Sequence, residues 1–150
     1  MEIDARTGML RLLRSDILHD AGDSINQAIN RGQVEGGFIQ GVGWLTTEEL
    51  VWDGTGRLLT HSPDTYKIPA IGDIPPDFRV SFLTRATQPN NIYGSKAVGE
   101  PPLMLAISVR EAIRDAVAQF GEPGGPVPLA SPASAEAIYR AIVARRMEAP

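Results

Sequence analysis

A glycine-rich stretch in the first half of the chain constrains the fold more than any other feature. Between residues 25 and 49, apolar side chains recur at helical spacing, at Ile25, Ala28, Ile29, Phe38, Val42 and Leu45. Five glycines also fall within the twelve residues 32–43. Each glycine inside a helix costs about 1 kcal/mol relative to alanine. We therefore expect a helix here, capped by Asp23 or Ser24, whose glycine face is approached closely by another backbone or by a ligand.

Two further helices are predicted from apolar periodicity. The clearer one runs from Pro101 to Phe120, since proline is tolerated in a first turn and Gly121 can end the helix. Its buried face is expected to hold Leu103, Ile107, Ile113, Val117 and Phe120, with Ala106, Val109 and Ala116 beside them. The other is a short helix from Ala135 to about Arg146, capped by Ser134.

Strand patterns occupy much of the remaining chain. Residues 1–18 predict a hairpin that turns at Thr7 and Gly8, and residues 49–60 predict a second hairpin around the turn 53–56. Proline-rich residues 61–76 are expected to form an extended loop. Residues 78–85 alternate as a strand, with a polar turn over 86–91.

These elements predict an α+β fold, in which β-hairpins pack with the glycine-rich helix and a second long helix. The length of 150 residues fits one domain. By composition we divide it into a main part, residues 1–121, a Gly/Pro-rich linker, residues 122–133, and a terminal helix, residues 134–147. The chain opens in what looks like the middle of a strand, so we expect it to be a piece of a larger protein.

Composition excludes several classes of function. The net charge of −4 argues against a nucleic-acid binder, which needs a basic face. The absence of cysteine rules out disulfides, cysteine-ligated clusters and a cysteine nucleophile in this chain, and two histidines are too few for a multi-histidine metal site. No apolar run is long enough to span a bilayer. These features predict a cytoplasmic protein with no metal ligands of its own.

Glu100 is the strongest candidate for chemistry. It precedes Pro101 and Pro102 at the start of the second predicted helix, where free N–H groups favour a negative charge. One interpretation is a carboxylate that merely stabilises the helix start. The alternative is a general base held in its ionised form. The residue pattern alone leaves both open.

The amides of Gln33 and Gln40 are the second candidate feature. Each carries a donor and an acceptor, and both stand on the glycine-rich helix. They could contact a polar cofactor, or they could be exposed amides on a tightly packed helix. The spacing is not a dinucleotide-binding fingerprint, because no strand with GxGxxG precedes it.

Three long strings resemble the molybdopterin-binding subunit of xanthine dehydrogenases and related molybdenum hydroxylases. They are GQVEGGFIQGVGWLTTEELVWD (32–53), THSPDTYKIPAIGDIPPDFRVSFL (60–83) and GSKAVGEPPLMLAISVREAIRDA (94–116). The similarity extends over residues 1–147 and implies that residues 1–121 form a C-terminal part of a larger molybdopterin-binding domain. Gln27 and Gly94 depart from the usual family residues, at positions with no chemical role.

The resemblance also implies roles for particular residues. The family hydroxylates purines or aldehydes with a water-derived oxygen, and the glutamate of its VGEPP motif is the general base, which maps onto Glu100. The glutamine that opens GQxEG lies near the pterin and maps onto Gln33. The backbone of Val98 and Gly99 would pass close to the metal.

The resemblance further implies cofactors and partners. We expect a molybdenum-molybdopterin cofactor in the full enzyme, iron–sulfur clusters and FAD on other modules, and none bound to this piece alone, which would be inactive. The partners would be the remainder of the subunit, those modules and a small purine or aldehyde substrate, with self-association through exposed surface. The alternative is a small subunit, either non-catalytic or acting in trans, that binds and completes a separate molybdopterin subunit.

Overall fold

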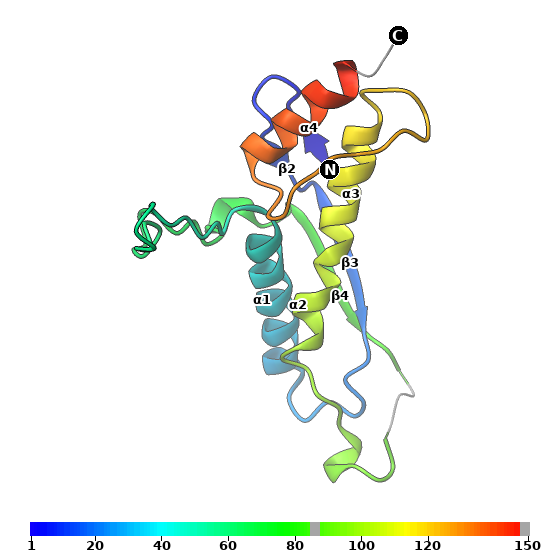
Figure 1. Ribbon diagram of the computed structural model, residues 1–150. Helices are drawn as coiled ribbons and strands as arrows, with labels where there is room; N and C mark the ends of the chain where they lie inside the picture. Colours follow the sequence, from blue (N-terminus) through cyan, green and yellow to red (C-terminus); the bar gives the residue numbers. More distant parts are fainter. Residues whose placement is uncertain (85–87, 148–150) are drawn as a thin grey trace.

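The computed structural model describes residues 1–84 and 88–147, and it confirms a mixed fold of helices and small sheets. Figure 1 shows an elongated molecule with one long arm. In chain order the elements are β1 (Glu2–Ile3), β2 (Leu10–Arg11), β3 (Arg14–His19), α1 (Gln27–Thr46), a 3-10 turn (Ile71–Asp73), β4 (Asp77–Phe82), a second 3-10 turn (Ile92–Gly94), α2 (Pro101–Leu105), α3 (Ile107–Ala118) and α4 (Ala135–Met147).

The strands form two separate two-stranded sheets. β1 and β2 make the expected N-terminal hairpin, but its strands are only two residues long. The rest of the predicted return strand, β3, leaves the hairpin and pairs in parallel with β4, from Arg14 beside Asp77 to His19 beside Phe82. A parallel pair requires a long crossover connection. Residues 20–76, which include α1, form that connection. The predicted strand of residues 78–85 is therefore β4, and part of the predicted turn, 85–87, lies outside the described residues.

Helix α1 begins and ends slightly inside its predicted bounds. Its cap is Asn26, whose side-chain oxygen accepts from the N–H groups of Ala28 and Ile29 at 3.1 Å each, so the predicted caps at 23 and 24 were wrong. The first turns of α1 are exposed, as are Ile29 and, just before the helix, Ile25, although both belong to the apolar pattern that predicted it. Burial begins at Val34 and continues to the end of the helix.

The second predicted helix is divided into α2 and α3. The N–H of Ala106 donates to the carbonyl of Leu103 at 3.2 Å, an i to i−3 bond that tightens the chain at the junction. The buried positions are Pro102, Ala106, Val109, Ile113 and Val117. They form one stripe at spacings of three and four residues. Ile107, expected on this stripe, lies next to it and is exposed.

The C-terminal residues pack onto the end of α3. Residues 122–133 contain neither helix nor strand, yet Leu129 and Ala133 are buried and the N–H of Ala133 donates to the carbonyl of Leu45 at 2.7 Å. The predicted helix α4 follows, and the Ser134 hydroxyl accepts from the N–H of Ala137 as expected. Arg145 of α4 is fully buried and donates to main-chain carbonyls of the segment 118–126.

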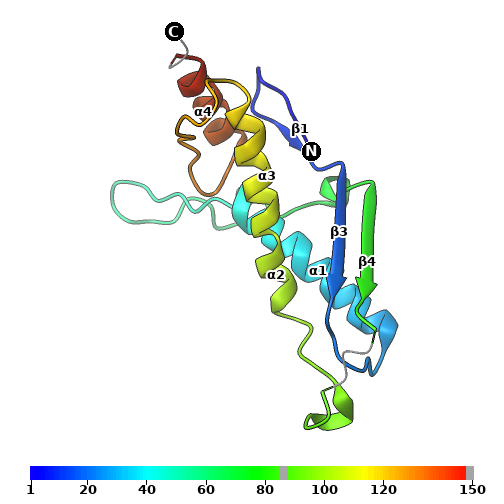
Figure 2. The ribbon, with the colours of Figure 1, turned by 90° about the vertical axis from the view of Figure 1, so that its right-hand side faces the viewer.

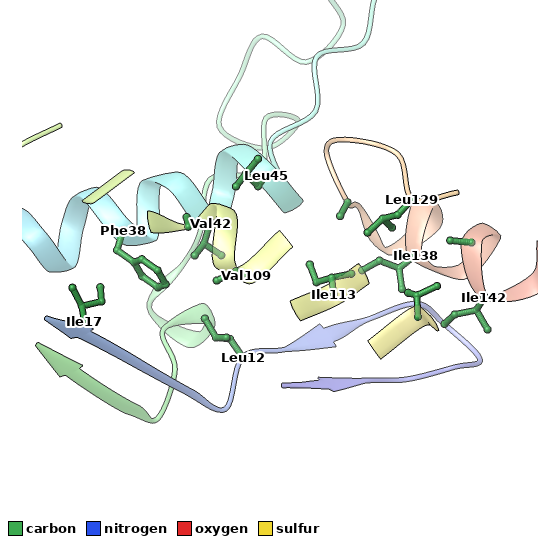
Figure 3. Packing of buried hydrophobic residues seen from close by; sticks show 14 of the residues in the cluster. Leu12, Ile17, Phe38, Val42, Leu45, Val109, Ile113, Leu129, Ile138 and Ile142 are labelled. Atoms are coloured by element: carbon green, nitrogen blue, oxygen red, sulfur yellow. The ribbon is translucent and has the colours of Figure 1, made fainter. Parts of the chain in front are cut away.

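One continuous apolar core joins these elements. Helix α1 contacts α2, α3 and β4, and Figure 2 shows α2 and α3 running end to end beside α1. Figure 3 shows side chains from the sheet, α1, α3 and α4 meeting in a single cluster. The rings of Phe38 and Phe78 lie 5.5 Å apart between α1 and β4. The core thus fixes the relative positions of α1 and α2, which carry the candidate site.

The segment between α1 and β4 forms the arm that projects from the body in Figure 1. The predicted hairpin over 49–60 is reduced to a single bridge, between Trp52 and Leu58, around a turn built on Asp53. Its turn was predicted correctly, whereas its strands are not formed. Within residues 1–84 and 88–147, no helix has both the length and the apolar character needed to cross a membrane.

Candidate functional site

Glu100 lies immediately before α2 and is exposed to solvent. Its backbone is already helical, at φ −87° and ψ −42°, and its side chain makes no capping hydrogen bond within the described chain. Pro101 and Pro102 carry no N–H, so two of the donors normally free at a helix start are missing. α2 is also only five residues long. The helix-stabilising interpretation of Glu100 therefore has little support from the geometry.

The residues just before Glu100 lie against α1. A Cβ placed on Gly37 would be 3.1 Å from the carbonyl oxygen of Gly99, and a Cβ on Gly99 would be 3.8 Å from the side-chain oxygen of Gln33. Val98 is half-buried and packs against the core. The fold thus brings all four predicted site residues into one neighbourhood, although Gln33 and Glu100 are 67 positions apart in the chain.

Four of the five glycines of α1 fall into two groups, whereas Gly43 lies against Glu48 and Pro69. Gly37 and Gly41 face α2, where an added Cβ on Gly41 would lie 2.3 Å from the carbonyl oxygen of Leu103. Gly32 and Gly36 are exposed, with nothing within 4 Å of an added Cβ. Gln33 stands between these two open glycines. A polar ligand could therefore reach both an amide and bare backbone on this part of α1.

An ion pair lies on the chain that leads to Glu100. The ammonium of Lys96 donates to the carboxylate of Asp20 at 2.5 Å. The hydrogen bond from Lys96 and one from the N–H of Gly22 hold the pKa of Asp20 below its ordinary value of 3.8. Sequence analysis missed this pair, because its members are 76 positions apart and no motif connects them.

The described residues also form a cavity, but no cluster of metal-binding side chains. Residues 1–84 and 88–147 hold no group of three or more His, Cys, Asp or Glu side chains that could bind a metal ion. A cavity of about 300 Å³ lies near the C-terminal end of α1, lined by residues that include Leu12, Val42 and Pro69. None of the four predicted site residues lines it.

Comparison with known proteins gives a consistent result. Residues 1–75 match the family model described as molybdopterin cofactor-binding domain. The chain is 49% identical over 146 residues to the xanthine dehydrogenase/oxidase of Gallus gallus and 51% identical over 148 residues to that of Rattus norvegicus, in each case covering 95% of this chain and 11% of the relative. The chain therefore spans about a tenth of the length of the curated relatives it matches.

A solved structure has the same fold. The crystal structure of quinoline 2-oxidoreductase from Pseudomonas putida 86 superposes with a TM-score of 0.82 and 31% sequence identity. The match covers 95% of this chain and 18% of that one. The arrangement of α1, α2, α3 and the strands is thus similar to one region of a much longer chain.

Proposed function

Because the chain belongs to the molybdopterin cofactor-binding domain family, we propose that it provides part of the active site of a molybdenum hydroxylase, with Glu100 as the general base. The observation that carries this proposal is the position of Glu100. Its exposed carboxylate has no partner in the described chain, and it follows directly on Gly99, which lies against α1 beside Gln33. The enzyme would be similar to xanthine dehydrogenase and would oxidise purines, related N-heterocycles or aldehydes in the cytoplasm.

The residues present fit a molybdenum-molybdopterin cofactor. The amide of Gln33 would hydrogen-bond the polar pterin, and the open backbone at Gly32 and Gly36 would let the cofactor approach α1 without meeting a side chain. The backbone of Val98 and Gly99 would line the reacting end. When bound, the cofactor supplies the two-electron redox chemistry. Iron–sulfur and FAD modules would lie outside this chain, which would hold no cofactor when isolated.

Glu100 would accept a proton at one of its carboxylate oxygens. Hydroxylation with a water-derived oxygen needs a base that removes a proton as the oxygen attacks carbon. A carboxylate engaged in a cap or an ion pair would first have to break that contact. The Glu100 carboxylate has no such contact within the described residues, so it can act once the remainder of the subunit encloses the site and excludes water.

The substitution Glu100→Gln in the molybdenum-loaded enzyme tests this role. Glutamine keeps the size and removes the base, so kcat should fall by about 10²- to 10⁴-fold. Molybdenum and pterin contents should stay at wild-type levels, which separates lost proton transfer from lost cofactor. Glu49→Gln, an exposed carboxylate beyond the end of α1, is the matched control and should retain full activity. A loaded Glu100→Gln enzyme that works within a few-fold of wild type would refute the proposal.

A further inference from the structure

The loop that leads to Glu100 is clamped to the turn after β3. The main chain of residues 94–96 makes two hydrogen bonds of 2.9 Å with the main chain of residues 21–23, and together they form an antiparallel bridge between Gly22 and Ser95. Gly22 has φ +60°, and a Cβ there would lie 2.4 Å from the carbonyl oxygen of Gly94. The two segments therefore approach as closely as backbone allows. Figure 2 shows both at the same end of the molecule.

The ion pair between Asp20 and Lys96 closes this clamp. One carboxylate oxygen of Asp20 accepts from the Lys96 ammonium at 2.5 Å, and the other accepts from the N–H of Gly22 at 3.0 Å. Both oxygens are therefore engaged, which fixes the orientation of the carboxylate. The two side chains are 40% and 30% exposed, so water screens the pair only partly.

In the part of the chain that the structure describes, no other polar side chain of the loop 88–99 makes a hydrogen bond or ion pair to the rest of the protein. Between residues 88 and 99, the side-chain hydrogen bonds of Asn91 and Ser95 are made to carbonyls within the loop itself. Ile92 and Tyr93 are exposed. Lys96 is thus the polar side chain that connects the loop to the body of the protein.

Only three residues separate Lys96 from Glu100. The far end of this short span is fixed by α2, where Pro102 is buried and Gly99 lies against Gly37 of α1. Val98 in the middle packs against the core. The place of Glu100 therefore depends on what holds Lys96 at the near end of the span.

We propose that Asp20 and Lys96 are positioning residues, and that their ion pair holds the backbone that carries Glu100 in place beside α1. The inference rests on the proposed function of Glu100. A half-exposed pair of this kind changes a local equilibrium by only about 1.5- to 5-fold, so its loss should leave the fold intact. A displaced catalytic group contributes little to the rate, so kcat should fall by about the same factor as the population in which Glu100 is in place.

The first test measures amide hydrogen exchange in the 150-residue chain. Lys96→Met removes the charge and keeps an apolar stem, whereas Lys96→Arg keeps a charge that can reach Asp20. Exchange of the Asp23 and residue-96 amides, whose N–H groups make the main-chain hydrogen bonds between the two segments, should rise about 2- to 5-fold in Lys96→Met and return toward wild type in Lys96→Arg. Exchange elsewhere and Tm should stay unchanged. The matched control is Arg140→Met, which removes an exposed 2.5 Å ion pair with Glu136 on α4.

The second test compares the same variants in the molybdenum-loaded enzyme. Lys96→Met should lower kcat by about 2- to 5-fold, the same factor as the rise in exchange, with KM and molybdenum content equal to those of wild type, and Lys96→Arg should recover the activity. Unchanged exchange at the amides of residues 23 and 96, or an equal rise in Arg140→Met, would overturn the inference. A wild-type kcat in Lys96→Met would also overturn the inference. If Glu100→Gln is inactive in the same assay, the proposed function of Glu100 is still supported. If Glu100→Gln is active, the proposed function fails. The exchange measurement then still tests whether the ion pair holds the backbone before Glu100 in place.

Discussion

Alanine substitutions at two glycines of α1 test how closely that helix packs, because the chemical change is identical and only the surroundings differ. Gly41 is buried, and a Cβ there would lie 2.3 Å from the carbonyl oxygen of Leu103 and 2.7 Å from the Cβ of Ala106. Gly36 is exposed, and nothing lies within 4 Å of its added Cβ. The two positions are five residues apart on one helix, so both substitutions gain the same helix propensity. Any difference between their effects on stability must come from the surroundings.

The two substitutions should change stability in opposite directions. Alanine is a better helix former than glycine by about 1 kcal/mol, and both variants gain this. At Gly41 the methyl group meets a main-chain carbonyl that cannot rotate away, so the cost of overpacking should reach the upper end of its range, about 3 kcal/mol. We expect Gly36→Ala to raise the free energy of unfolding by about 1 kcal/mol and Gly41→Ala to lower it by about 2 kcal/mol.

Unfolding by urea and by heat, followed by circular dichroism at the helix band, measures both effects. A separation of about 3 kcal/mol corresponds to roughly 6–12 °C in Tm for a chain of this size. The urea m-value should be the same in both variants, which shows that the unfolded states are comparable. Gly41→Ala as stable as wild type would refute the close contact between α1 and α2. Equal destabilisation by Gly36→Ala would refute the open surface.

Two further predictions concern the C-terminal helix and the arm. Arg145→Met removes the buried donor to carbonyls of residues 118–126 and should lower the free energy of unfolding by at least about 2 kcal/mol, while exposed Arg140→Met should change it by less than about 0.5 kcal/mol in the same urea titration. Hydrogen bonds from the Thr55 hydroxyl and from main-chain N–H groups lower the pKa of Asp53 from 3.8. The turn is therefore stabilised above pH about 4 and loses this support as pH falls through the folded-state pKa. NMR titration of the turn amides should show a midpoint below 3.8, and Asp53→Asn should abolish that transition.

The existence of the helices was predictable from the sequence. Which residues face the core at the start of the second predicted helix was not. Leu103 and Ile107 are the most apolar residues at the start of that pattern, so hydrophobicity selects them as the buried face. The structure buries the expected Ala106 but also Pro102 in place of Leu103 and Ile107, because the glycines of α1 bring its backbone close to that side of α2. Apolar periodicity detects large side chains in a core, and a contact made of glycine and alanine gives it almost no signal.

Contacts between segments far apart in the chain also could not be predicted from the sequence. The alternation of β4 was read correctly, but its parallel partner β3 lies more than 50 positions earlier, and alternation does not identify partners. The burial of Arg145 is a second example, since nothing in the sequence distinguishes it from the adjacent Arg146 at the end of the predicted helix. The partners of Arg145 are carbonyls of an irregular segment, which no side-chain pattern reveals.

The predicted site residues came from local strings that resemble a family, and the structure explains why strings alone could not describe their setting. Glu100 was expected to owe its charge to a helix start. Two prolines and a five-residue helix leave little of that effect. The features that hold the residue in place are the contact of Gly99 with α1 and the Asp20–Lys96 pair, both made between distant segments.

The glycine-rich helix shows why composition left two interpretations open. Packing against a backbone and access for a ligand both require a bare Cα, so five glycines in twelve residues are compatible with either. In the structure the two requirements fall on different glycines. α2 reaches Gly37 and Gly41 but not Gly32 and Gly36. The packed pair sets the distance between α1 and the residues before Glu100, and the open pair leaves the surface beside Gln33 free for the cofactor that we propose. Substitution of Gly37 and Gly41 should therefore damage the site by lowering stability. Substitution of Gly32 and Gly36 should damage it by weakening cofactor binding.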